Sequence, residues 1–158
     1  MNTVFAKILR IWMLLLTLLL VVQFALAGFG IGYGGALEDG FGMHFANGNA
    51  LLYLYAAAIP LALASRAGAA PVWLTALGAF LVLLQHGMAL VNVPGTLWGQ
   101  SLFLFHALNG LALVFLAHRT GVLVRNRIRE RGAAGPTRGG RTGHAADEAP
   151  ASAGPEAS

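Results

Sequence analysis

The sequence predicts an all-α membrane protein: a four-transmembrane-helix up-down bundle made of two repeated helical hairpins, followed by a disordered C-terminal tail. Of its 158 residues, 57% are hydrophobic and 10% are charged, whereas soluble domains carry about 25% charged residues. The apolar residues gather in four stretches, each near the roughly 20 residues that a helix needs to cross the hydrocarbon core. Because the backbone must satisfy its own hydrogen bonds in lipid, we expect these stretches to be helices.

The four stretches contain no Asp, Glu, Lys or Arg and follow one another closely. They are Ile11–Ala27, His44–Ala64, Val72–Val93 and Ser101–Ala117. Pro60 lies inside the second stretch, where we expect it to kink the helix. Glycine, proline and arginine mark the expected loops, which are Gly28–Gly42, Arg66–Pro71 and Asn92–Gly99. Tryptophans near three expected helix starts suit the membrane interface; they are Trp12, Trp73 and Trp98.

The basic residues predict the orientation of the chain. They fall at one end of the expected bundle, at Lys7, Arg10, Arg66 and from Arg119 onward. The positive-inside rule then places both termini in the cytoplasm, in a multi-pass protein of a bacterial plasma (inner) membrane. The first stretch could instead be a signal peptide cleaved after Ala25–Ala27, and the sequence leaves open whether it is removed. Its length and its place in the repeat described next favour a retained helix.

We expect one bundle domain and one tail. The bundle covers residues 1–124, with repeat one at about 8–65 and repeat two at about 70–120. Residues 125–158 begin with a basic segment that suits anionic lipid headgroups. From Gly132 the composition is poor in apolar residues, and we expect disorder. Nucleic acid is a weaker explanation of the basic segment, because the membrane topology already accounts for its charge.

An offset of 62 residues aligns the two halves of the chain. The matched polar and glycine pairs are Gln23/Gln85, His44/His106, Asn47/Asn109 and Gly48/Gly110, since 85 − 23, 106 − 44, 109 − 47 and 110 − 48 each equal 62. Polar residues are rare in membrane segments, so these matches indicate a duplicated helical hairpin. Each repeat begins on the same side of the membrane. We therefore expect His44 and His106 at matching depth, in the outer part of the bilayer.

The repeated motif His-x-x-Asn-Gly places its three residues on one helix face. In an up-down bundle the second and fourth helices can be diagonal partners, so two inward-facing imidazoles could hold an iron atom between them. Glycine leaves room there for a flat macrocycle, and the asparagines could contact its propionates or the histidine edges. The candidate cofactor-binding residues are His44, His106, Asn47, Asn109, Gly48, Gly110, Gln23 and Gln85, with His44 and His106 as metal ligands.

Histidines so placed on the second and fourth helices resemble one half of the haem A synthase family. The chain also looks like the small four-helix membrane proteins of high-GC bacteria. The first resemblance implies that His44 and His106 are the axial ligands of a haem. Phe41 and Phe45 stand where that family has a glutamate and an arginine, and the chain has no cysteine. The resemblance therefore implies haem binding more than catalysis on the haem.

Two functions remain open from the sequence. The first is a protein that binds one b-type haem for electron transfer or haem handling, with a redox partner or a membrane complex, and not an enzyme. The second is a cofactor-free scaffold, accessory subunit or small transporter, in which the histidines and glutamines only join helices. For His86 and His118 we expect structural and interfacial roles. His144 lies in the tail, and Glu38 and Asp39 suit a solvated turn. The glycine-rich run Gly30–Gly35 formally matches a dinucleotide-binding motif, but it follows an expected membrane helix where that motif needs a preceding strand.

Overall fold

The computed structural model describes residues 1–33, 37–91 and 95–133, apart from the side chains of residues 37 and 38. These residues form four helices and no strand: α1 (Thr3–Gly32), α2 (Leu37–Ser65), α3 (Ala69–Leu90) and α4 (Leu97–Ala133). Each helix is long and apolar enough to cross a membrane. The predicted fold class is confirmed, and the chain has the architecture of a multi-pass integral membrane protein.

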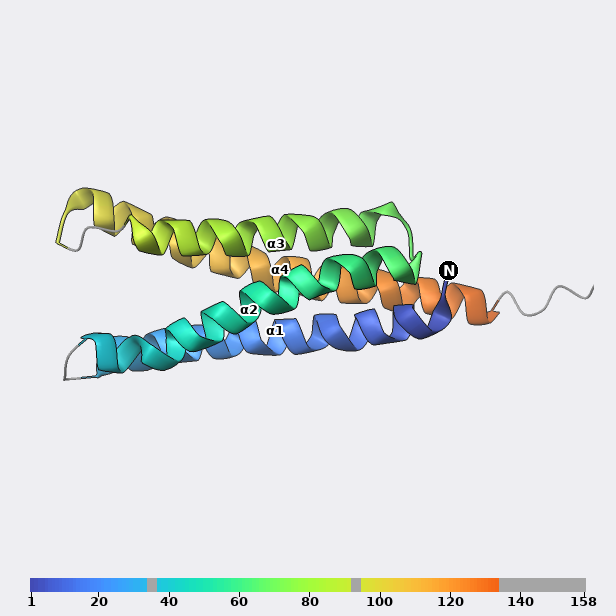
Figure 1. The fold of residues 1–158 in the computed structure, drawn as a ribbon, viewed down its shortest axis with the longest axis horizontal. Helices are drawn as coiled ribbons and strands as arrows, with labels where there is room; N and C mark the ends of the chain where they lie inside the picture. Colours follow the sequence, from blue (N-terminus) through green and yellow to red (C-terminus); the bar gives the residue numbers. More distant parts are fainter. Residues whose placement is uncertain (34–36, 92–94, 134–158) are drawn as a thin grey trace, which may run out of the picture.

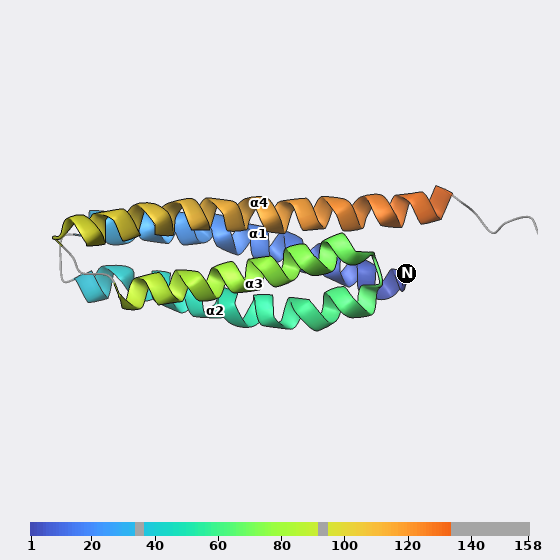
Figure 2. The ribbon, with the colours of Figure 1, turned by 90° about the horizontal axis from the view of Figure 1, so that it is seen from above.

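The helices run up and down as two hairpins, α1–α2 and α3–α4 (Figure 1). Both hairpin connections lie at one end of the bundle, called here the hairpin end. The N-terminus and the α2–α3 turn lie at the other, called the terminal end, beyond which α4 projects (Figures 1 and 2). Helix α1 packs against α2 and α4, and α3 packs against α2 and α4. As predicted, α2 and α4 are therefore diagonal to one another.

Helix α1 supplies a regular stripe to the core. Its buried residues include Leu9, Met13, Leu16 and Leu20, which are spaced by three or four and so share one helix face. Most residues between them are exposed; Leu14, for example, is 70% exposed. Such outward apolar side chains are costly in water and favourable in lipid, which fits the membrane assignment.

The expected loop at Gly28–Gly42 was wrong for most of its length, because α1 continues to Gly32 and α2 begins at Leu37. Two of its glycines, Gly30 and Gly40, serve close helix packing there. A Cβ added to Gly30 would lie 2.9 Å from the Phe41 ring, and one added to Gly40 would lie 2.9 Å from the Tyr33 Cβ. Glycine costs about 1 kcal/mol in a helix, but here it lets α1 and α2 approach one another up to the hairpin end.

Other helices also extend beyond the ends predicted from the sequence. Helix α4 begins at Leu97, next to a Thr96 hydroxyl that accepts a 3.0 Å hydrogen bond from the backbone N–H of Gly99. It continues through the basic segment to Ala133, so the expected boundary at residue 124 does not interrupt it. Disorder from Gly132 was wrong for Gly132 and Ala133, which are helical; the remainder of the tail lies outside the described residues. Helix α2 runs through Pro60 without ending.

Two of the three tryptophans lie near helix starts and are exposed: Trp73 on α3 by 73% and Trp98 on α4 by 60%. Trp12 lies well inside α1, because this helix begins at Thr3. It is partly buried, and its Nε1 donates a 3.0 Å hydrogen bond to the backbone carbonyl of Leu54 on α2. Trp12 therefore joins the two helices of the first hairpin.

Helices α2 and α3 approach one another closely at mid-bundle. Tyr55 is buried, with 1% of its surface exposed, and its hydroxyl donates to the Leu113 carbonyl at 3.4 Å. Its ring lies directly over Gly78, where an added Cβ would overlap the Cε1 atom and lie 3.1 Å from Cζ. The absence of a side chain at position 78 therefore makes room for this tyrosine.

We expect Gly78→Ala to lower the free energy of unfolding by about 1–3 kcal/mol, because the added methyl group overpacks the Tyr55 contact. Gly87→Ala on the same helix is the matched control, since an added Cβ there meets nothing within 4 Å. Reversible unfolding in mixed micelles measures both. Equal effects of the two substitutions would contradict the packing described here.

Candidate binding site between the two hairpins

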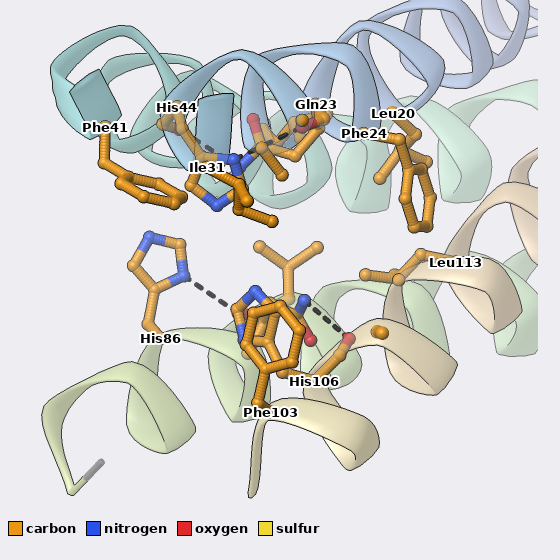
Figure 3. A pocket seen from close by; sticks show the side chains of 18 residues that line it. Leu20, Gln23, Phe24, Ile31, Phe41, His44, His86, Phe103, His106 and Leu113 are labelled. Carbon is orange, nitrogen blue, oxygen red and sulfur yellow. Dashed lines mark hydrogen bonds between the residues drawn. The ribbon is translucent and has the colours of Figure 1, made fainter. Parts of the chain in front are cut away.

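A cavity of about 280 Å³ lies between the two hairpins and receives side chains from all four helices (Figure 3). Its lining contains no Asp, Glu, Lys or Arg and is mostly apolar. The residues are Leu20, Gln23, Phe24, Ala27, Gly28, Ile31, Phe41, His44, Gly48, Leu51, Val82, Gln85, His86, Phe103, His106, Ala107, Gly110 and Leu113. Six of the eight predicted cofactor-binding residues are in this lining. The site suits an uncharged or largely apolar ligand.

The first hairpin holds its polar residues in a small network. The Gln23 side-chain amide donates to the backbone carbonyl of His44 at 3.0 Å, and its Oε1 accepts from Asn47 Nδ2 at 2.6 Å. The second hydrogen of the Asn47 amide goes to the Leu19 carbonyl at 3.0 Å. Three hydrogen bonds thus join α1 to α2. We call this arrangement of Gln, Asn and the His carbonyl the hairpin clamp.

The second hairpin carries the same clamp at the offset of 62. Gln85 donates to the His106 carbonyl at 2.9 Å and accepts from Asn109 Nδ2 at 2.5 Å. The Asn109 amide also donates to the Leu81 carbonyl at 2.8 Å, as Asn47 does to Leu19. The repeat seen in the sequence is therefore also a repeat of hydrogen bonds. Asn47 and Asn109 are absent from the cavity lining, and their amides bond to the glutamine and to a backbone carbonyl of the facing helix.

The glycine of each motif lies next to the glutamine amide of its clamp. A Cβ added to Gly48 would lie 3.4 Å from Gln23 Nε2, and one added to Gly110 would lie 3.7 Å from Gln85 Nε2. The glutamine amide thus passes over the glycine to reach the carbonyl of the histidine four residues earlier. At Gly110 the ring of Phe24, from the other hairpin, would also lie 3.1 Å from the added Cβ. Gly110 therefore leaves space for the Phe24 ring between the two hairpins.

The two histidine rings face one another across the cavity, His44 from one hairpin and His106 from the other (Figure 3). Their ring centres are 6.3 Å apart, with planes inclined by 36°. His44 Nδ1 lies 3.2 Å from the Gln23 backbone carbonyl. Because a carbonyl only accepts, this nitrogen carries the proton, which leaves the Nε2 lone pair of the neutral ring available. Phe41 meets the same ring edge-on at 5.7 Å.

One pair of polar residues has no counterpart in the other repeat, and the sequence analysis missed half of it. His86 Nε2 lies 3.2 Å from Asn49 Oδ1, across the α2–α3 interface, and His86 Nδ1 lies 2.9 Å from the Val82 carbonyl. At the offset of 62 their counterparts are Phe24 and Leu111. A search for polar residues whose counterpart at this offset is apolar would have pointed to Asn49. Because His86 lines the cavity, α3 contributes a polar ring where α1 contributes Phe24.

The remaining sequence candidates lie elsewhere. His118 is exposed and borders a second cavity nearer the terminal end. His144 and the side chain of Glu38 lie outside the described residues, whereas Asp39 is exposed. Gly30 and Gly32 belong to the last turns of α1, so they form no strand-to-helix turn. Among the described residues, no group of three or more His, Cys, Asp or Glu side chains could hold a metal ion; the histidine pair offers two ligands.

Comparisons of the chain with protein-family models, with curated protein sequences and with solved structures give no match.

We expect the clamp bonds to be coupled within a hairpin and independent between hairpins. Gln23→Ala and Asn47→Ala should show a coupling energy of about 0.6 kcal/mol in a double-mutant cycle, since interhelical bonds in membranes have this average strength. Gln23→Ala combined with Asn109→Ala should be additive, because these residues share no hydrogen bond. Unfolding free energies in mixed micelles measure both cycles. Coupling in the second cycle and none in the first would contradict the clamp.

Proposed function

We propose that the chain binds one b-type haem between its hairpins, with His44 and His106 as axial ligands, for electron transfer or haem handling in a membrane. The observation that carries this proposal is the pair of repeat-related imidazoles, whose centres are 6.3 Å apart across a cavity. Bis-histidine ligation needs two protein ligands, so the absence of a larger metal-binding cluster among the described residues does not oppose it.

The ring separation fits a shared metal. Two metal–imidazole bonds of about 2 Å, with about 1 Å from each nitrogen to its ring centre, give centres about 6 Å apart. A direct hydrogen bond of about 3 Å between the rings would bring the centres to about 5 Å. The observed 6.3 Å matches the first arrangement and exceeds the second.

Each residue of the site has a distinct role in this proposal. His44 and His106 provide the ligating nitrogens, and the Gln23 carbonyl fixes the tautomer that leaves Nε2 of His44 free. Leu20, Leu51 and other apolar residues of the lining exclude water. When bound, haem would supply one-electron chemistry, with a potential set by its ligands and by this apolar surrounding. A redox partner or a membrane complex would exchange the electrons.

The orientation predicted from the basic residues completes the proposal. With both termini in the cytoplasm of a bacterial cell, the hairpin end faces outward and the histidine pair lies in the outer half of the plasma membrane. A haem at that depth would suit a partner on the outer side of the membrane.

A second candidate is a cofactor-free bundle acting as a scaffold, accessory subunit or small transporter. The observation that favours it is the completeness of the clamps, in which Gln23, Asn47, Gln85 and Asn109 are hydrogen-bonded within their own hairpins. The histidines would then contribute packing and a bond to the Gln23 carbonyl. This candidate leaves unexplained why both rings point into one cavity.

A reduced-minus-oxidised spectrum of the purified protein tests the first proposal. We expect a low-spin b-type spectrum, with haem retention reduced at least about tenfold in His44→Ala and in His106→Ala, because each removes one axial ligand. His118→Ala, an exposed histidine outside the cavity, is the matched control and should retain the spectrum. Added imidazole should restore the low-spin signal of the two cavity variants.

Two outcomes would oppose the proposal in different ways. Protein that stays colourless with excess hemin would favour the cofactor-free bundle. Equal haem retention in all three histidine variants would show that haem binds elsewhere, and would remove the ligand assignment alone.

A further inference from the structure

A second cavity, of about 140 Å³, lies between α1 and α4 nearer the terminal end and is separate from the histidine site. Its lining combines basic and apolar residues. It includes Arg10, Met13, Leu14, His118, Gly121 and Arg125. The two helices meet closely at its floor, where a Cβ added to Gly121 would lie 3.4 Å from the Met13 Cβ.

The two arginines of this cavity have no partner for their charge. Within the described residues, Arg10 and Arg125 form no hydrogen bond through their side chains and no ion pair, and Arg125 Nε is buried without a partner. Two other arginines of α4 differ: Arg127 Nη1 lies 3.6 Å from Glu130 Oε2, and Arg131 donates to the Met1 carbonyl at 3.3 Å. A guanidinium stays charged at any accessible pH, and a buried N–H without a partner is costly.

An anion bound between the two arginines would accept a hydrogen bond from the buried Nε–H of Arg125. Its negative charge would also offset the repulsion between two cations on facing helices. No carboxylate lines the cavity. Phosphate oxygens match the planar fork of arginine and can accept from two guanidinium groups at once.

The position of the cavity favours a phosphate that belongs to a lipid headgroup. Leu14, which lines it, is 70% exposed on the lipid-facing surface of α1. Toward the hairpin end the α1 sequence contains no charged residue after Arg10. A headgroup at the arginines thus continues directly into an apolar surface that acyl chains can cover. Basic pockets between transmembrane helices are typical sites for anionic lipid headgroups.

We propose that this cavity is a specific site for an anionic phospholipid, whose phosphate lies between Arg10 and Arg125 and whose acyl chains run along the surface marked by Leu14. The site is independent of haem. It would fix the depth of the bundle in one leaflet and brace α1 against α4.

Lipid titration of the purified, delipidated full-length chain, followed by native mass spectrometry, tests the proposal. The probes are phosphatidylglycerol, phosphatidylcholine and inorganic phosphate. We expect phosphatidylglycerol to bind about 30-fold more tightly than phosphatidylcholine, since two arginines near the headgroup contribute. Inorganic phosphate should bind far more weakly, because it has no acyl chains.

The variant Arg10→Gln/Arg125→Gln should lose the preference for phosphatidylglycerol. Arg127→Gln/Arg129→Gln removes the same charge from the exposed face of α4 and should retain the preference within about threefold. Arg125→Lys keeps the charge but lacks the Nε–H and the planar fork, so about a fivefold loss is expected. Helicity and a monodisperse elution profile establish that each variant folds.

Three results would overturn the proposal. Equal losses in the two double variants would mean that total charge attracts the lipid without a site. Inorganic phosphate binding as tightly as phosphatidylglycerol would mean that acyl chains contribute nothing. A preference that appears only after neutralising the tail acids Asp147, Glu148 and Glu156 would mean that the chain's own carboxylates fill the cavity.

Discussion

The structure depends on one constraint: an amide placed among membrane helices must find its hydrogen-bond partners within the protein. Gln23 and Asn47 satisfy this requirement by bonding to one another and to backbone carbonyls of the facing helix, and Gln85 and Asn109 repeat the solution. The clamp fixes the register of each hairpin, because a shift of one residue would break all three bonds. It also holds the backbone of each neighbouring histidine, whose ring lines the cavity.

The two ends of the bundle thus carry opposite chemistry. Near the hairpin end lies a neutral, largely apolar cavity with two imidazoles, and nearer the terminal end lies a cationic cavity with two arginines. Arg10 and Gln23 are 13 residues apart on α1, or about 20 Å along a helix. This separation is most of the thickness of a hydrocarbon core. The histidine pair and the arginine pair are therefore well separated along the bundle, and the two proposals stand on separate observations.

Much of this architecture could be predicted from the sequence, because lipid allows few alternatives to a helix and because a duplicated Gln, His and Asn are improbable by chance. Helix ends were harder to predict. Gly30 and Gly40 resembled loop residues, and their role became clear only once Phe41 and Tyr33 were seen to pack over them. Asn49 escaped notice because it bonds to a residue 37 positions away that is itself unmatched in the repeat. The arginine pair could not be inferred either, since the α1–α4 contact that brings Arg10 and Arg125 to one cavity is set by the whole bundle.

The central claim is that both imidazoles ligate one iron. Low-temperature electron paramagnetic resonance of the ferric, hemin-loaded protein tests it most directly, because the spin state reports the number of strong axial ligands. The account predicts a low-spin signal in the full-length protein that becomes high-spin when either His44 or His106 is replaced by alanine. A high-spin signal in the unmodified protein, or a low-spin signal that survives both replacements, would contradict it.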